Sequence, residues 1–539
     1  MPSAADPPPV EPDELTEFML RPDSYPDAAS RVELVETRIS RVFLTDRFVY
    51  KLKKPVRFEF LDFSTRAARR EACRDEVRLN RRLARNAYLG VVPVWRDARG
   101  KFVLGKPCDP DDPAFASEAN MEDAVEWLVA MRRLDHERML DRLIERGTLA
   151  DEQVQELAAT LGSFYAVQPL SKLTPSEYRG AILHHVRANR ADLSAAAPAA
   201  EHRRIRKTHA AQLAFLCRHR ILFDARIAAG RIIDGHGDLR PEHVCLESPP
   251  VVYDCVEFSA ELRRIDTADE LAFLLMECTR LGRRDVGQTI LAAYEQASGD
   301  RPPDALTAFY ESYRACVRAK VAALRLAQQS GDKAQATEHE LRQYLELAEQ
   351  SLPRFHRPTL YVMRGLMGSG KSTLAAAIAE SLGIERVRTD VIRQELQGTT
   401  NAPAAFGTGA YTPRRRREVY VELLRRCRVL LSRGESVVAD GTFLNAEELQ
   451  LAEQTTGDVQ AELLIVECRC AAELAKQRIA TRLREGSDVS EARPELYDRQ
   501  AAAAAPVPSE LRSVTVDTAL PAAAQLAALW DQSQHSVNE

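Results

Sequence analysis

The sequence predicts two folded regions of different class: an α+β region with two lobes, followed by an α/β domain built on a parallel sheet. Its 539 residues are too many for one hydrophobic core. Residues 30–135 are rich in strand patterns around one helix, whereas residues 150–350 are mainly helical. From Thr359 onward strands alternate with helices, and this alternation is typical of a parallel sheet covered on both faces.

The boundaries of these regions follow from local composition. Residues 1–19 are rich in proline and acidic residues, and we expect them to form a disordered tail. The first folded region then covers residues 20–350, and its small lobe ends at about residue 135. Prolines bracket residues 351–358, which are predicted to be a linker between separately folding parts. The second domain covers residues 359–535.

The hydrophobic pattern also gives the order of the elements. In the first region it predicts the strand "RFVYKLKKPV", the helix "REACRDEVRLNRRL" and the late helices "FYESYRACVRAKVAALRLAQQ" and "EHELRQYLELAEQSL". In the second domain it predicts the strand "TLYVMRG", the helix "KSTLAAAIAESLG", the strand "ERVRTD", the helix "RRRREVYVELLRRCRVLLSRG" and the strands "SVVADGT", "AELLIVECR" and "SVTVDT".

Composition excludes several classes of function. The chain is 45% hydrophobic and 28% charged, and no apolar run approaches the ~18 residues that a membrane-spanning helix needs. The N-terminal sequence lacks the pattern of a secretory signal, so a cytoplasmic location is expected. A net charge of −5 with intermixed signs gives no general reason to expect nucleic-acid binding. The ten cysteines form no C-x-x-C pair, which favours free thiols over disulfides or metal ligands.

A phosphate-binding motif opens the second domain. The stretch "GLMGSGKS", from Gly365 to Ser372, fits G-x-x-x-x-G-K-[ST] between a predicted strand and a predicted helix. In this motif backbone N–H groups and the helix N-terminus face phosphate oxygens. Lys371 is expected to reach the β and γ phosphates of ATP, and the Ser372 hydroxyl to bind Mg²⁺. The other candidate nucleotide-binding residues are Gly368, Ser369, Gly370 and Thr373.

With three further stretches, "RTDVIR", "SVVADGT" and "RIATRLREGSDVSEA", the second domain resembles the small P-loop kinases, the group that contains gluconate kinase, polynucleotide kinase and the zeta toxins. The resemblance implies that Asp390 is the base and that Arg393 contacts the acceptor hydroxyl and the bound phosphate. It implies that Asp440 steadies the Mg²⁺ shell. The third stretch resembles a lid whose arginines face the transferring phosphoryl group, or alternatively form a solvated helix face: Arg478, Arg482 and Arg484.

The first region contains a second candidate site. Residues 235–246, "GHGDLRPEHVCL", place Asp238 in a polar stretch between two apolar runs, and Asp254 lies at a second bend, in "VVYDCVEF". Phosphoryl transfer to a hydroxyl needs one carboxylate to take the proton and a second to hold Mg²⁺. A polar turn without catalytic function is the alternative interpretation of Asp238.

This stretch resembles the aminoglycoside phosphotransferase and choline kinase branch of the protein-kinase-like fold, whose catalytic loop reads H-G-D-x-x-x-x-N. The resemblance implies that Asp238 is the base and Asp254 a metal ligand. His243 stands where the family carries Asn. An imidazole can bind a metal or donate a hydrogen bond, but Mg²⁺ prefers oxygen ligands. His236 is expected to support the loop through hydrogen bonds.

The small lobe supports the same resemblance. Lys51 lies on a predicted strand, where this fold places the lysine that binds the α and β phosphates. Glu76 best fits the acidic partner of that lysine, with Glu71 as the alternative. No G-x-G-x-x-G precedes the lysine; "TRISRVFL" takes its place, and Ser40 is the candidate to cover the phosphates. Asp266 is expected to be structural.

The whole chain resembles bacterial proteins described as bifunctional aminoglycoside phosphotransferase and ATP-binding proteins. This implies an MgATP-dependent kinase with two nucleotide sites that acts on hydroxyl-bearing small molecules. One alternative is an impaired kinase-like domain that regulates the P-loop kinase. Another is a P-loop domain that phosphorylates nucleic-acid ends or nucleotide sugars, although "PRRRREVY" favours a solvated helix start over a nucleic-acid patch.

Overall fold

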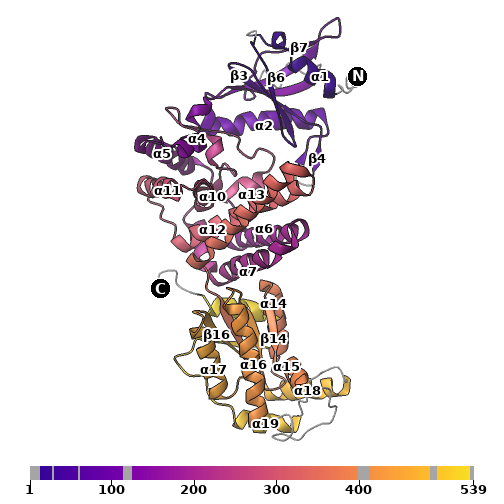
Figure 1. Cartoon of the computed structure of the whole chain (residues 1–539), viewed down its shortest axis with the longest axis vertical. Helices are drawn as coiled ribbons and strands as arrows, with labels where there is room; N and C mark the ends of the chain where they lie inside the picture. Colours follow the sequence, from indigo (N-terminus) through magenta and orange to yellow (C-terminus); the bar gives the residue numbers. More distant parts are fainter. Residues whose placement is uncertain are drawn as a thin grey trace. The chain divides into compact units, whose positions relative to one another are not determined.

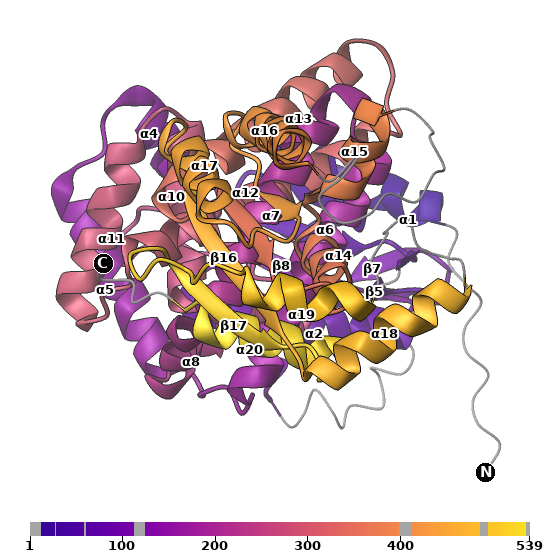
Figure 2. The same cartoon turned by 90° about the horizontal axis from the view of Figure 1, so that it is seen from below.

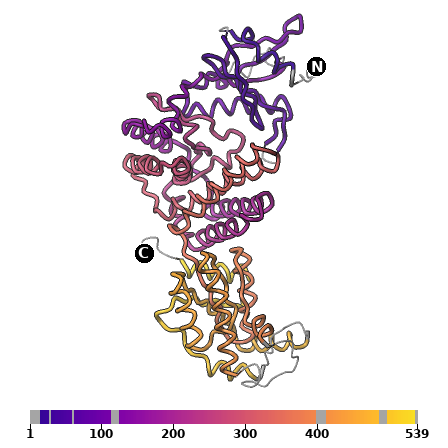
Figure 3. Tube along the Cα trace, viewed as in Figure 1, coloured from indigo at the N-terminus to yellow at the C-terminus, as the bar shows by residue number. Residues whose placement is uncertain are grey.

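A computed structural model describes six stretches of the chain: residues 12–26, 29–58, 61–112, 124–397, 412–485 and 494–534. The chain divides into two compact units, each of two segments. Unit 1 comprises Met1–Lys172 and Arg226–Pro302, and unit 2 comprises Leu173–Ala225 and Pro303–Glu539. Figure 3 traces the chain through both units.

The small lobe of unit 1 is an antiparallel sheet in the order β1-β2-β3-β8-β6-β7. Its strands are β1 (Glu33–Glu36), β2 (Ser40–Leu44), β3 (Phe48–Lys53), β6 (Tyr88–Arg96), β7 (Phe102–Leu104) and β8 (Glu126–Arg132). A short separate hairpin pairs β4 (Arg57–Phe58) with β5 (Leu61–Asp62). Because side chains alternate along a strand, Tyr50 and Leu52 of β3 enter the core and Lys51 and Lys53 point to the other face.

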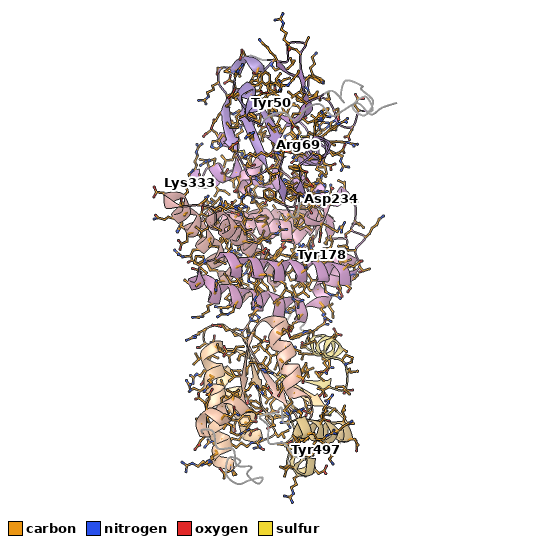
Figure 4. The ribbon with its side chains drawn as sticks, turned by 90° about the vertical axis from the view of Figure 1, so that its right-hand side faces the viewer. Tyr50, Arg69, Tyr178, Asp234, Lys333 and Tyr497 are labelled. Carbon is orange, nitrogen blue, oxygen red and sulfur yellow. The ribbon has the colours of Figure 1, made fainter. Side chains whose placement is uncertain are left out.

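Helix α2 (Arg66–Ala84) packs on this lobe and crosses beneath the sheet in Figure 1. Its first turn is capped by Thr65, whose side chain accepts a hydrogen bond from the Ala68 N–H. Arg69, labelled in Figure 4, forms a buried ion pair with Glu126 of β8, with 2.6 Å between Nη2 and Oε2. The pair fixes the helix against the sheet.

Residues 12–19, expected to belong to a disordered tail, instead form helix α1 (Pro12–Met19). Leu15 and Met19 are buried in the core of the small lobe because they lie four residues apart on one helical face. The rest of the expected tail, residues 1–11, lies outside the described residues.

The larger part of unit 1 is mainly helical around one apolar core. Its helices are η3 (His136–Arg138), α4 (Leu140–Arg146), α5 (Asp151–Val167), η5 (Pro241–His243), α9 (Ala260–Arg263), α10 (Thr267–Arg280) and α11 (Arg284–Ser298). Two antiparallel pairs join β9 (Ile232–Asp234) to β12 (Arg264–Asp266) and β10 (Val244–Cys245) to β11 (Val251–Val252). The loop between β9 and β10 carries Asp238, and Asp254 follows β11. Each aspartate therefore lies in the loop that comes directly after a short strand.

The helical part of unit 2 consists of long antiparallel helices. They are α6 (Pro175–Ala196), α7 (His202–Arg218), α12 (Asp304–Leu326) and α13 (Gly331–Gln350), with the short turns η4 (Ala199–Glu201) and η6 (Leu352–Arg354). α8 (Arg220–Ala228) spans the junction of the two units. Tyr178, labelled in Figure 4, shares a buried hydrogen bond of 3.0 Å with Tyr310, which joins α6 to α12.

The second part of unit 2 is a parallel sheet in the order β14-β15-β13-β16-β17. Its elements are β13 (Thr359–Arg364), α14 (Lys371–Leu382), β14 (Glu385–Arg388), α15 (Thr389–Gln397), α16 (Pro413–Leu431), β15 (Val437–Asp440), α17 (Ala446–Gly457), β16 (Glu462–Arg469), α18 (Ala472–Glu485), α19 (Pro494–Ala502), β17 (Ser513–Asp517) and α20 (Ala522–Gln532). In Figure 2, α16 and α17 lie on one side of β16 and β17, and α20 on the other.

Strand register brings three strand ends together. Met363 of β13 and Arg388 of β14 both lie opposite Asp440 of β15. In a parallel sheet the carboxyl ends share one edge, and ligands bind in the crevice where the strand order reverses. The loop after β13 therefore opens beside Asp440.

Residues 351–358, the predicted linker, pack within unit 2. The Phe355 ring lies 5.5 Å from Phe215 of α7, centroid to centroid. Arg218 of α7 forms an ion pair of 2.6 Å with Glu462 at the start of β16. The separate folding of the parts on either side of this segment stays a prediction. Among the described residues, no helix is long and apolar enough to cross a membrane.

Candidate active sites

Lys51 is the centre of the first site. Its Nζ lies 2.8 Å from Glu76 Oε1 on α2 and 2.9 Å from Asp254 Oδ1 after β11. The structure therefore brings together three residues that the sequence selected from positions far apart. Glu71, the alternative partner, is exposed and pairs with Arg74. Burial alone would lower the pKa of Lys51, but the carboxylates of Asp254 and Glu76 raise it well above its usual range.

Lys53 is a second lysine of this network, and the sequence analysis did not select it. Its side chain is fully buried, with Nζ 2.7 Å from both Glu76 Oε2 and Glu257 Oε1. Glu257 lies three residues after Asp254, so the pair joins β3 to the segment that carries the metal-ligand candidate. The two-residue period of a strand was the available signal, because it places Lys53 on the face of Lys51.

Asp254 has a left-handed backbone, with φ of 61°. Few residues other than glycine adopt this region, and such conformations concentrate at functional sites. Burial opposes ionisation, but Lys51 and then His243 lower the pKa of the Asp254 carboxyl. The side chain remains 43% exposed, so one face of an ionised carboxylate is open to a ligand.

The loop after β9 places two polar side chains, Arg240 and His243, against Asp238. Arg240 Nε lies 3.2 Å from Asp238 Oδ2, and His243 Nδ1 lies 2.9 Å from the Asp238 backbone oxygen. His243 Nε2 is 3.7 Å from Asp254 Oδ2, so the imidazole lies between the two aspartates. Arg240 was not selected from the sequence, although it lies two residues after Asp238.

Buried groups hold this loop in place. His236 Nε2 donates to the Tyr253 carbonyl over 2.9 Å, and burial lowers the pKa of the imidazole to about 4. Arg82 of α2 donates to the Gly235 carbonyl over 2.8 Å, a contact that the sequence did not reveal. Asp266 caps α10 and pairs with Arg226 at 2.7 Å, which is a structural arrangement.

Ser40 begins β2 directly after a tight turn. The Thr37 hydroxyl accepts a hydrogen bond from the Ser40 N–H over 2.9 Å, so only two residues form the turn. Ser40 lies opposite Lys53 in the strand register and is fully buried. Within the described part of the chain, its hydroxyl has no hydrogen-bond partner. This turn is much shorter than a glycine-rich phosphate-covering loop.

The second site is formed by the loop between β13 and α14. Gly368 and Gly370 have φ of 76° and 82°, in the left-handed region that favours glycine. A Cβ on Gly368 would lie 2.4 Å from the Ala475 carbonyl oxygen, so no side chain fits there. Lys371 Nζ donates to the Leu366 carbonyl over 2.8 Å and thereby closes the loop. Gly365, Ser369 and Thr373 lie in the same loop or in the first turn of α14.

Lys371 has no carboxylate within ion-pair distance among the residues that the structure describes. Burial lowers its pKa, and the carboxylates of Asp440 and Asp390, which lie nearby without forming an ion pair with this lysine, only partly oppose that effect. The Ser369 hydroxyl is also buried, and it has no hydrogen-bond partner within those same stretches. A phosphate would supply the missing anion and acceptor.

Asp440 and Asp390 lie at the ends of neighbouring strands. Ser372 donates its hydroxyl hydrogen to Asp440 Oδ1 over 3.2 Å, and burial raises the pKa of the Asp440 carboxyl. Asp390 lies in the first turn of α15, with Oδ1 2.9 Å from Arg393 Nη1. Arg386 and Arg388 of β14 approach Asp440 Oδ2 at 3.9 and 4.0 Å, and the sequence analysis missed both.

The lid arginines differ from one another. Arg478 donates to the Thr518 carbonyl over 2.8 Å, and Thr518 in turn donates to the Ser369 carbonyl over 2.6 Å, which ties α18 to the phosphate-binding loop. The positive charge of Arg482 lies close enough to Lys371 to contribute to the lowering of its pKa. Arg484 contacts only its own helix among the contacts that the described residues make. The remainder of the predicted lid, residues 486–492, lies outside those stretches.

The donor groups fit ATP and Mg²⁺. Within the described stretches, no group of three or more His, Cys, Asp or Glu side chains is placed to hold a metal ion. Mg²⁺ is instead bound by one or two carboxylates together with phosphate oxygens and water. Asp254 in the first site, and Ser372 with Asp440 in the second, supply such oxygens. All ten cysteines are free.

Fold and site together define the class: a protein-kinase-like domain with a small antiparallel lobe and a helical part, followed by a P-loop domain with a parallel sheet. Residues 360–507 match the family AAA_33, an AAA domain. The protein Rv2004c of Mycobacterium tuberculosis (strain ATCC 25618 / H37Rv) is 32% identical over 465 residues, which cover 85% of this chain and 88% of the relative. The chain belongs to the same family as this mycobacterial protein. The fold class predicted from the sequence is confirmed.

Two solved structures resemble separate parts of the chain. A choline/ethanolamine kinase family protein from Mesorhizobium loti is 13% identical and covers 63% of this chain and 99% of its own, with a TM-score of 0.36. A gluconokinase from Sinorhizobium meliloti 1021 is 21% identical and covers 33% of this chain and 93% of its own, with a TM-score of 0.25.

Proposed function

We propose that this chain is an MgATP-dependent phosphotransferase with two nucleotide sites, and that its acceptors are hydroxyl-bearing small molecules in the cytoplasm. The observation that carries the proposal is the constellation of Lys51, Glu76, Asp254 and Asp238 in one unit, together with the phosphate-binding loop at Lys371 in the other. Each set contains a phosphate-binding cation, a magnesium-binding oxygen and a carboxylate base.

In the first domain, Lys51 binds the α and β phosphates and Glu76 holds the lysine in place. Asp254 provides the oxygen ligand for Mg²⁺, which when bound neutralises charge on the phosphates. Asp238 accepts the proton of the acceptor hydroxyl as that oxygen attacks the γ phosphorus, while the bond from phosphorus to the β,γ-bridging oxygen breaks and ADP leaves. Ser40, which lies opposite Lys53 in the strand register, is the residue proposed to cover the phosphates. His243 lies between base and metal ligand.

In the second domain, the loop from Gly365 to Thr373 surrounds the phosphates through its backbone N–H groups. Lys371 binds the β and γ phosphates. Ser372 and Asp440 orient Mg²⁺. Asp390 accepts the acceptor proton, with Arg393 beside it at 2.9 Å. Arg478 and Arg482 on α18 face the transferring phosphoryl group.

Nucleic acid is a less favoured acceptor. The basic start of α16 is the strongest candidate for a nucleic-acid surface, but three of its four arginines already pair with glutamates. Arg416 lies 2.5 Å from Glu448, and Arg417 lies 2.8 Å from Glu447. Phosphate binding there would have to displace these pairs.

An acceptor screen tests the proposal. Purified full chain is incubated with γ-labelled ATP and with sugars, aminoglycosides, nucleotides or 5′-hydroxyl oligonucleotides, and labelled products are counted. We expect a labelled small molecule. The variants Asp238→Asn and Asp390→Asn assign each product to one domain. If both variants still formed every labelled product, the assignment of Asp238 and Asp390 as bases would be contradicted.

A further inference from the structure

The Arg240 guanidinium lies at the centre of the first catalytic loop. Besides Asp238, it contacts Glu242, with Nη1 2.7 Å from Oε1, and His243, with Nη2 2.9 Å from Nε2. Its side chain is 13% exposed, so these contacts replace most of its hydration. A guanidinium does not lose its proton in proteins, and its planar fork is fixed by the three partners.

These contacts determine the tautomer of His243. Nδ1 lies 2.9 Å from the Asp238 carbonyl oxygen, which can only accept, so Nδ1 carries the hydrogen. Nε2 then has one lone pair, and that lone pair accepts the hydrogen of Arg240 Nη2. The nitrogen that faces Asp254 is therefore already used, and it cannot bind a metal at the same time.

Electrostatics adds a second reason. A divalent ion held between Asp254 and His243 would share the Nε2 atom of His243 with the permanently charged Arg240, whose Nη2 lies 2.9 Å from that nitrogen. Like charges a few ångströms apart repel more strongly at a partly buried site than in water, because the surroundings screen them less. The side of Asp254 that faces His243 thus already has a cation.

We propose that the first domain works with one metal ion, bound at Asp254, and that Arg240 supplies the second positive charge. This inference rests on the proposed function of that domain. Arg240 orients the Asp238 carboxylate, and it fixes His243 as a hydrogen-bonding support instead of a ligand. A histidine at position 243 in place of asparagine is then compatible with turnover, because a site with one metal ion needs no second metal ligand at this position.

A metal count tests the inference independently of turnover. The full chain with Lys371→Ala and Asp440→Asn, which disable the second site, is titrated with Mn²⁺ in the presence of the non-hydrolysable analogue AMPPNP. Free Mn²⁺ is followed by electron paramagnetic resonance. We expect one Mn²⁺ for each bound nucleotide. His243→Asn alone should keep this count, because Arg240 remains.

Removing the cation should change the count. Arg240→Gln combined with His243→Asn supplies an amide oxygen without the guanidinium, and we expect a second Mn²⁺ and a spectrum broadened by spin–spin coupling. Arg283→Gln, at an exposed pair with Asp285, is the matched control and should leave one ion. Circular dichroism checks the folding of each variant.

The outcomes separate the two claims. Two ions bound with Arg240 and His243 intact would overturn the inference while leaving the proposed function in place. A double variant that still binds one ion would show that Arg240 does not exclude the second, which also overturns it. Absence of any Mn²⁺–nucleotide binding in the parent chain would overturn the proposed function of this domain, and the inference with it.

Discussion

The two candidate nucleotide sites hold their lysines in opposite electrostatic states. Lys51 has two carboxylate partners within 2.9 Å, and its pKa is raised. Lys371 has a backbone carbonyl as its partner, and its pKa is lowered by burial. A nucleotide at the first site must exchange one ion pair for another, whereas the phosphate-binding loop offers an uncompensated cation. The same chemical task therefore has different free-energy costs in the two domains.

The largest effect expected from a single substitution is on catalysis. Asp238→Asn should lower transfer by the first domain roughly 10²- to 10⁴-fold, the range expected for a lost general base. Asp390→Asn should do the same to the second domain only. Nucleotide affinity should stay unchanged in both variants, as measured by calorimetry. If one substitution abolished both activities, the two sites would not be independent.

Nucleotide affinity should separate the two lysines. Lys371→Ala should weaken binding at the second site by about 10- to 100-fold, because it removes charge-assisted hydrogen bonds. Lys51→Ala should weaken nucleotide binding at the first site by about tenfold or less. The loss is small because the variant no longer has to break an ion pair with Asp254 when the nucleotide binds. Calorimetry with AMPPNP measures each site in a chain whose other site carries its alanine. Equal losses would contradict the ion-pair-exchange argument.

Folding stability should show the reverse order. Lys51→Met should lower the free energy of unfolding by about 1–3 kcal/mol, since Glu76 stays buried with one cation instead of two. Lys371→Met should be neutral or slightly stabilising, because it removes a desolvated amine. Lys333→Met, at an exposed position of α13 labelled in Figure 4, is the control. Melting curves that fall equally for both sites would contradict this prediction.

The smallest expected effect is on the acid sensitivity of metal binding. The pKa of Asp254 is lowered, so its carboxylate stays ionised when the pH falls below about 4, the ordinary pKa of an aspartate. The pKa of Asp440 is raised by burial, so Asp440 takes up a proton first. Mn²⁺–nucleotide affinity at the second site should therefore decline at a higher pH than at the first. Coincident pH profiles of the two sites would refute this order.

Sequence patterns were sufficient for the fold class, and short motifs were sufficient to propose residues of the candidate sites. Lys51, Asp238 and Lys371 lie in local stretches whose chemistry can be read directly. The pair between Lys53 and Glu257 could not be read, because it joins residues 204 positions apart and depends on how β3 packs. The helix at residues 12–19 was not predicted, because the proline and acidic content of residues 1–19 is typical of a disordered tail and only three residues of the helix are apolar, Leu15, Phe18 and Met19.

The contacts of Arg240 were unpredictable for a different reason. Its position two residues after Asp238 was visible, but the direction of its side chain depends on the loop and on the short helix η5. The same is true of Arg82, whose bonds to the backbone of the catalytic loop require α2 and β9 to meet. Side-chain direction in irregular backbone has no sequence period.

The left-handed backbone at Asp254 limits how this site can be lost over evolutionary time. A change of one base in an aspartate codon can give asparagine or glycine, and these residues tolerate that backbone best. A descendant with either residue would keep the shape of the loop and lose its negative charge, whereas most other replacements would damage both. Lineages that abandon catalysis here are therefore expected to carry asparagine or glycine and to persist as folded binding modules.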